Sequence, residues 1–239
     1  MRFLLLILLL LGCDDRATVT VGAASSLAEV MPEIAAAYEV ETGVRVQLVF
    51  ASSGKIVQQQ LAGAGYDVTV LADDSLDGTP VAGNRLVLVG VGSLDELDDI
   101  GRVAIGAPDT VPAGKYARQA LQSAGVWDDL DGRLVYGANV RQVLAYVQRG
   151  EVDAALVYAT DAEGVPIDPA LHDPIDYRAT YFTDTGDRFA GFLHKPTAGL
   201  AFEAHGFVDR AALLRNAGVS DLPGPSVAEQ RGSEPAGAR

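Results

Sequence analysis

Short runs rich in β-forming residues alternate along this chain with segments of helical periodicity, and this alternation constrains the fold most. The predicted strands cover residues 18–21, 44–50, 67–72, 86–89, 103–105, 134–136, 154–158 and 177–182. The predicted helices cover residues 27–42, 54–62, 112–123 and 140–149. Such alternation indicates α/β lobes with mostly parallel sheets flanked by helices. In these sheets, ligands bind beyond the carboxyl ends of the strands, where helices begin.

Three of the strand-to-helix junctions carry small or hydroxyl residues, at positions 23–27, 50–55 and 111–114. A helix start has unpaired backbone N–H groups and carries the positive end of the helix dipole. Several starts directed at one point would hold a small oxyanion without a buried Lys or Arg. The junctions therefore predict an anion receptor that binds through hydrogen bonds.

The acidic composition excludes several classes of partner. With 18 Lys and Arg against 32 Asp and Glu, the formal net charge is −14, which argues against nucleic acid and against a basic patch for anionic lipid. The apolar content of 49% predicts a folded core.

No catalytic set stands out, so we do not expect an enzyme. The three histidines, His172, His194 and His205, lack metal-ligand spacing. Neighbouring acidic pairs such as Asp73-Asp74 point apart on a helix or strand. The Ser52–Lys55 segment ends like a phosphate-binding loop but lacks its upstream glycine.

The first residues have the pattern of a lipoprotein signal peptide. Arg2 precedes an apolar run over residues 3–11, which is too short to span a bilayer. Leu10-Leu11-Gly12-Cys13 resembles a bacterial lipobox, which predicts a signal peptide over residues 1–12, lipidation of Cys13 and a tether over residues 13–17. The alternative is a secretory signal with a chance cysteine. The lipid would hold the protein on the outer, periplasmic face of the cytoplasmic membrane.

An ordered series of motifs resembles the molybdate-binding proteins of ABC importers, over roughly residues 19–207. The motifs are Ala24-Ser25-Ser26-Leu27, Phe50-Ala51-Ser52-Ser53-Gly54, and the segments 66–73, 82–87, 107–117, 139–147 and 150–162. The resemblance implies a two-lobed periplasmic-binding-protein-like fold of type II, with the ligand cleft between the lobes. It places lobe 1 at residues 18–84 plus 180–207 and lobe 2 at residues 85–179. The crossovers then fall at residues 84–89 and 177–182.

Two segments depart from the family pattern. The stretch between Asp73 and Ala82 is shorter than usual, so a short loop is expected there. Residues 208–239 extend beyond the usual end and have the composition of a largely disordered tail.

The resemblance also implies a set of ligand-binding residues. The oxyanion would be bound by Ser26, Ser53, Ala113, Val140 and Tyr158, the serines through hydroxyl and backbone N–H groups, Ala113 and Val140 through backbone N–H groups, and Tyr158 through its phenol. Molybdenum would be present only as molybdate, or tungsten as tungstate, with no cofactor and no direct protein–metal bond. The expected partners are a separate permease and its ATPase, and the receptor itself is expected to be a monomer.

All five residues offer donors and none offers a carboxylate. Molybdate, tungstate and sulfate only accept hydrogen bonds near pH 7, whereas hydrogen phosphate also needs an acceptor for its proton, so the set predicts rejection of phosphate. Receptors for sulfate, thiosulfate or a small carboxylate stay open as alternatives. Taken alone, each serine is also consistent with simple helix capping, and Tyr158 with a core tyrosine.

Overall fold

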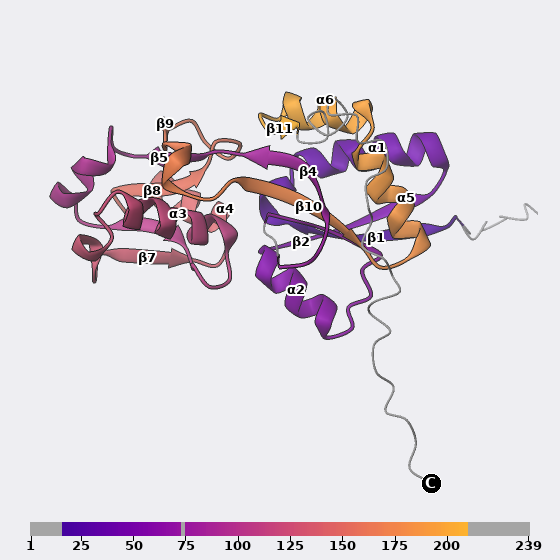
Figure 1. The fold of residues 1–239 in the computed structure, drawn as a ribbon, viewed down its shortest axis with the longest axis horizontal. Coiled ribbons are helices and arrows are strands. Elements are labelled where there is room, and N and C mark those ends of the chain that lie inside the picture. Colours follow the sequence, from indigo (N-terminus) through magenta and orange to yellow (C-terminus); the bar gives the residue numbers. More distant parts are fainter. Residues whose placement is uncertain (1–15, 73–74, 210–239) are drawn as a thin grey trace, which may run out of the picture.

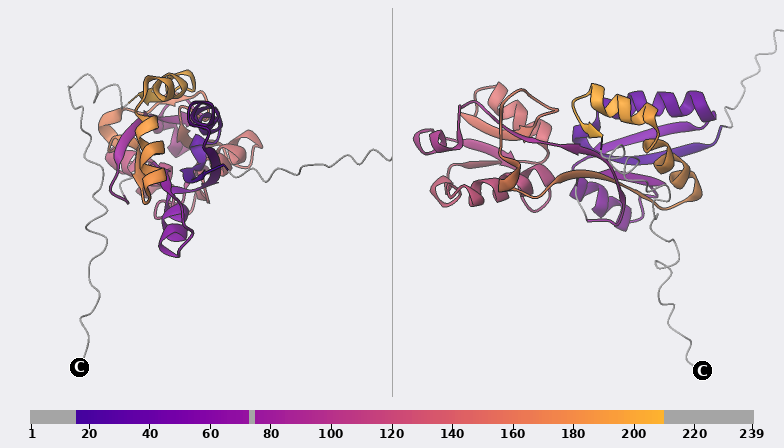
Figure 2. Two further views of the ribbon diagram at one scale, coloured as in Figure 1. Left: turned by 90° about the vertical axis from the view of Figure 1, so that its right-hand side faces the viewer. Right: turned by 45° about the horizontal axis from the view of Figure 1, so that its top comes forward.

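The computed structural model describes residues 16–72 and 75–209, which form two lobes lying end to end (Figures 1 and 2). The predicted signal peptide, Cys13 and residues 210–239 of the expected tail lie outside the described residues. Within the described part, no helix is both long and apolar enough to cross a membrane.

Lobe 1 is built on a six-stranded sheet. Its strands lie in the order β11 (Val208–Asp209), β4 (Thr79–Asn84), β10 (Ile175–Tyr181), β3 (Val68–Leu71), β1 (Thr18–Ala24) and β2 (Arg45–Ala51). One face is covered by α1 (Val30–Thr42), α5 (Asp184–Leu193) and α6 (Pro196–Ala204), and the other by α2 (Ser53–Leu61), as Figure 1 shows. The larger core lies under the three helices, where the Tyr38 ring meets those of Phe189 and Phe192 edge-on at 5.0 and 5.2 Å.

Lobe 2 is built on a five-stranded sheet. Its strands lie in the order β7 (Leu134–Gly137), β6 (Val103–Gly106), β8 (Ala154–Tyr158), β5 (Leu86–Val89) and β9 (Val165–Pro166). Helices α3 (Pro112–Ser123) and α4 (Val140–Gln148) pack against β6 and β8. The short 3-10 helices η2 (Leu94–Asp99), η3 (Asp128–Leu130) and η4 (Pro169–Leu171) complete the lobe.

Two chain segments cross between the lobes. The first passes from β4 through Arg85 into β5, as expected. The second returns as β10, and its pairing with β3 and β4 begins at Ile175 opposite Asn84. Lobe 1 therefore resumes near residue 175 rather than at residue 180, because β4 pairs with the returning strand from its first residue, Ile175, onward. The first two residues of the expected tail also belong to this lobe, since β11 pairs with β4.

The two-lobed α/β class is confirmed, and both sheets are mixed. The β1–β2, β1–β3, β6–β7 and β6–β8 pairs are parallel. The crossover strands β5 and β10 run antiparallel to their neighbours, because each brings the chain into a sheet from the opposite lobe.

The helix expected from Leu27 is divided in the structure. Ser25–Leu27 form the 3-10 helix η1, and α1 begins at Val30. Pro32 consequently lies in the first turn of α1, where its missing N–H removes no internal helix bond. Ser26 lies inside η1 and does not cap α1, whose N-cap is Glu29, so the alternative of simple capping does not apply to Ser26 at that helix.

Candidate ligand-binding site between the lobes

A small cavity, open in part to solvent, lies where the two lobes meet. Its lining consists of Ala24, Ser25, Ser26, Ser52, Ser53, Ala72, Val111, Pro112, Ala113, Val140 and Tyr158. The structure thus brings all five predicted residues to one cavity. Lobe 1 supplies the serines, and lobe 2 supplies the other three residues.

The first residues of α2 form one wall of the cavity. Ser52 is the N-cap, and the first backbone N–H with an acceptor in the helix is that of Ile56, bonded to Ser52 O at 3.0 Å. The Ser53 and Gly54 amides precede it, so the helix itself offers them no acceptor. Ser53 is buried, and its Oγ accepts a bond from the Ala72 N–H at 3.1 Å. This contact leaves the Ser53 hydroxyl proton available to the cavity.

The start of α3 faces this wall from lobe 2. Pro112 occupies the first turn and has no N–H, while the Gly114 N–H bonds to Val111 O at 2.8 Å. Between them, the Ala113 N–H has no acceptor within the helix. The helix start approaches β6 closely, because a Cβ on Gly114 would lie 2.0 Å from Gly106 O. Glycine at position 114 is therefore required for the close packing of α3 on β6.

The start of α4 adds a further amide group. Asn139 caps the helix through its Oδ1, which accepts from Gln142 N at 2.9 Å. The Val143 N–H bonds to Asn139 O at 3.3 Å. Val140 precedes both, and its buried backbone N–H again has no acceptor within the helix.

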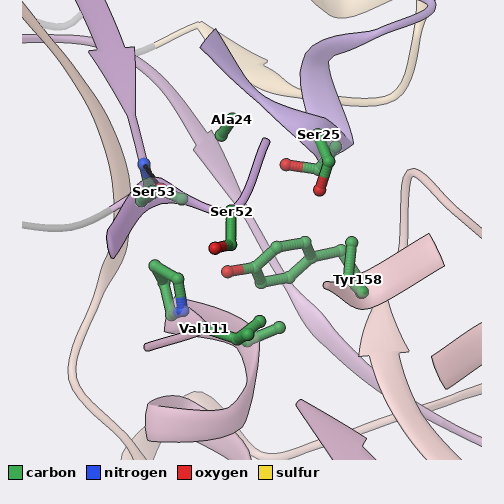
Figure 3. Close-up of a pocket in the computed structure, with 11 residues that line it drawn as sticks. Ala24, Ser25, Ser52, Ser53, Val111 and Tyr158 are labelled. Carbon is green, nitrogen blue, oxygen red and sulfur yellow. Dashed lines mark hydrogen bonds between the residues drawn. The ribbon is translucent and has the colours of Figure 1, made fainter. Parts of the chain in front are cut away.

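Ser26 and Tyr158 complete the cavity. Ser26 Oγ lies 2.8 Å from the hydroxyl of Tyr177, which sits behind the lining. Tyr158 is the last residue of β8 and is 2% exposed. Its hydroxyl end lies toward Ser52, and the ring spans the space between the lobes (Figure 3). Each of the five predicted residues thus lines the cavity and carries a group that can donate a hydrogen bond.

Among residues 16–72 and 75–209, no charged side chain lines the cavity. Arg141, in the first turn of α4, joins the lobes next to it. Its Nε donates to Ser25 O at 3.0 Å, and its terminal nitrogen donates to Glu29 Oε1 at 2.9 Å. Burial raises the pKa of Asp161 to about 7, although nearby Arg141 lowers it in part. Within residues 16–72 and 75–209, no group of three His, Cys, Asp or Glu residues is arranged to hold a metal ion.

Several residues of the site were not predicted as ligands. Ser25 and Ser52 line the cavity next to the two predicted serines, and the tandem Ser-Ser pairs were the signal that could have identified them. Asn84 and Tyr177 were missed because they reach Ser26 only through tertiary contacts.

The sequence profile of the family described as bacterial extracellular solute-binding protein matches residues 19–208. A protein named as a candidate ABC transporter substrate-binding lipoprotein, YvgL of Bacillus subtilis, is 34% identical over 227 residues, covering 81% of this chain and 87% of its own. The molybdate-binding protein ModA of Escherichia coli is 32% identical over 230 residues, covering 81% of this chain and 90% of its own.

Solved structures have the same fold. The substrate-binding domain of a candidate molybdenum ABC transporter from Clostridium difficile superposes with a TM-score of 0.62 at 27% identity, covering 81% of this chain and 99% of its own. The periplasmic molybdate-binding protein of Azotobacter vinelandii superposes with a TM-score of 0.71 at 21% identity, covering 80% of this chain and 98% of its own.

Proposed function

Because this chain belongs to the family of bacterial extracellular solute-binding proteins, we propose that its interlobe cavity binds molybdate and that the protein delivers the ion to an ABC importer. The ligands are Ser26, Ser53, Ala113, Val140 and Tyr158. The same donors suit tungstate, which has the same charge and shape.

The observation that carries this proposal is the chemistry of the cavity lining. Amide groups at three α-helix starts and hydroxyl groups from both lobes converge there, and none of the described residues that line the cavity carries a carboxylate. Such a lining matches a fully deprotonated tetrahedral oxyanion, because each ligand oxygen only accepts hydrogen bonds. Each bond to a charged ligand contributes about 1.5–3 kcal/mol, so several donors support tight binding after desolvation is subtracted.

The names of the relatives favour molybdate within this class of anions. Four of the curated relatives are named molybdate-binding protein ModA, with identities from 27% to 32%. A receptor for another small oxyanion, such as sulfate, is the alternative that the lining chemistry also permits.

The route of delivery follows from the family. The protein acts outside the cytoplasm as a receptor and releases the anion unchanged to a permease, which a separate ATPase subunit drives. The proposed lipid on Cys13 holds the receptor at the outer face of the cytoplasmic membrane. A single copy suffices, since its two lobes together supply all five ligands.

Calorimetric titration of the protein with molybdate, tungstate, sulfate and phosphate tests the proposal. We expect nanomolar to micromolar molybdate binding, a weaker response to sulfate and the weakest to phosphate. Sulfate binding as tight as molybdate binding would favour the alternative receptor. Absence of binding for all four anions would refute the oxyanion site itself.

A further inference from the structure

A chain of hydrogen bonds leads from the crossover between the lobes to the ligand cavity. It runs from Asn84, the last residue of β4, through Tyr177 on the neighbouring strand β10, to Ser26 in η1. All three residues are buried, but only Ser26 lines the cavity. Building on the proposed function, we propose that Asn84 and Tyr177 are positioning residues that direct the Ser26 hydroxyl proton into the cavity and thereby disfavour oxyanions that carry a proton.

The direction of the chain is fixed at Asn84. The Arg85 backbone N–H donates to Asn84 Oδ1 at 2.8 Å. A backbone N–H cannot accept, so this contact identifies the oxygen end of the amide. The amide nitrogen then faces Thr160 Oγ1 at 2.9 Å and the Tyr177 hydroxyl at 3.2 Å. Asn84 is therefore a donor to Tyr177.

The next hydrogen bond, between Tyr177 and Ser26, then has Tyr177 as its donor. Since the Tyr177 oxygen accepts from Asn84, its proton is directed to Ser26 Oγ, 2.8 Å away. Tyr177 is fully buried, and this burial raises the pKa of its hydroxyl above the usual value, which keeps the proton in place at neutral pH. Ser26 Oγ accepts that proton, so its own hydroxyl proton points toward the cavity.

The hydroxyl of the second serine, Ser53, is also oriented by a donor, in this case a backbone N–H. Ser53 Oγ accepts from the Ala72 backbone N–H at 3.1 Å, which likewise directs the hydroxyl proton away from that contact. Ser26 and Ser53 therefore both direct a hydroxyl proton toward the cavity. A ligand proton such as that of hydrogen phosphate meets a donor rather than an acceptor at these two serines, and an unpaired buried polar hydrogen weakens binding strongly.

Substitution of Asn84 by aspartate is expected to reverse the donor and acceptor roles along these hydrogen bonds. In Asn84→Asp, a carboxylate would accept the Tyr177 proton, Tyr177 would accept from Ser26, and the Ser26 lone pairs would face the cavity. In Tyr177→Phe, the donor to Ser26 is lost, and the serine is free to accept a ligand proton. The matched control is Tyr181→Phe, the same chemical change on the same strand β10, at a residue that does not line the cavity.

The readout is the ratio of the phosphate to the molybdate dissociation constant, measured by calorimetry at pH 7.5. We expect this ratio to fall about tenfold or more in Tyr177→Phe and in Asn84→Asp, as one hydrogen bond to a charged ligand is gained on one side, and to stay constant in Tyr181→Phe. General damage to the site weakens both anions alike and leaves the ratio unchanged. If phosphate binds the native protein too weakly to measure, measurable binding in Asn84→Asp supports the proposal, and continued absence overturns it.

The result of this experiment can be distinguished from failure of the proposed molybdate-binding function. Sulfate, which also carries no proton at this pH, serves as a second reference, so the phosphate-to-sulfate ratio tests the chain even if molybdate is not the ligand. If Tyr177→Phe does not fold, Asn84→Asp alone decides. An unchanged ratio against both references in a folded variant would overturn the positioning role.

Discussion

The substitution Gly54→Ala tests whether the interlobe arrangement seen here is the ligand-binding one. Gly54 lies in the first turn of α2 in lobe 1 and faces Thr110, which precedes α3 in lobe 2. A Cβ at position 54 would lie 2.8 Å from Thr110 O and 3.3 Å from its Cα. The added methyl group therefore opposes contact between the lobes, and the residue that it meets most closely, Thr110, does not line the cavity.

The methyl group destabilises the interlobe arrangement described here, which we call the closed state. Thr110 belongs to a turn held by bonds from Thr110 N and Val111 N to Ala107 O, at 3.1 and 2.8 Å. The atom that the methyl group meets is thus backbone, and a side chain cannot rotate to relieve the contact. Overpacking of this kind costs about 1–3 kcal/mol, which corresponds to about 5- to 150-fold weaker binding.

In an open state, in which the lobes are separated, the same change increases stability. Alanine is favoured over glycine in a helix by up to about 1 kcal/mol, and the contact with Thr110 is absent once the lobes separate. We therefore expect Gly54→Ala to bind molybdate more weakly while the ligand-free protein unfolds at the same or a higher temperature. Calorimetry and thermal unfolding without ligand measure the two effects.

Gly191→Ala is the matched control for Gly54→Ala. Gly191 lies within α5 of the same lobe, and a Cβ there would have no neighbour within 4 Å. This variant should gain stability in the same way but bind molybdate with unchanged affinity. Native affinity in Gly54→Ala would refute the reasoning, because ligand binding would then not require the lobe contact described here.

Three further predictions concern single side chains at the cavity or close to it. Ser53→Ala and Tyr158→Phe each remove one hydroxyl donor and should weaken molybdate binding by about 1–3 kcal/mol in calorimetry; native affinity in both would exclude these residues from the site. Arg141→Gln removes a partly exposed bridge between the lobes and should speed molybdate release only severalfold in stopped-flow measurements, since exposed pairs contribute about 0.2–1 kcal/mol. Asp161→Asn tests a buried carboxyl whose pKa burial raises from 3.8 to about 7: the folded protein holds this proton more tightly than the unfolded chain, so the native protein should lose stability relative to the variant as the pH rises from about 4 to 7. A difference in unfolding temperature that does not change with pH would contradict this assignment.

Most of the α/β framework could be predicted from local patterns. The strand over residues 154–158 and the helix starts at Pro112 and Val140 agree with the structure, because apolar runs and capping residues act over a few positions. The division of the first helix could not be predicted, because the helical spacing of apolar residues continues through η1 and the start of α1. Helices α5 and α6 and strand β4 were missed, since their stability depends on packing against the sheet of lobe 1.

The residues of the candidate site were predicted only through their resemblance to a family. Ala113 and Val140 carry no chemical signal in the sequence, because their contribution is a backbone N–H that any residue except proline could supply. Their importance depends on the preceding Pro112 and Asn139, which set the first turn of each helix.

The sequence by itself determined where each donor group is created, since helix starts, caps and serine pairs are set by neighbouring residues. Only the tertiary structure decided that these groups face one cavity, because the two lobes meet through contacts between residues far apart in the chain, such as Arg141 with Ser25. The proposed direction of the Ser26 hydroxyl is likewise tertiary, because it depends on Asn84 and Tyr177 from two neighbouring strands. Which group donates in a hydrogen bond depends on all the groups linked to it by further hydrogen bonds, and no local sequence pattern determines this.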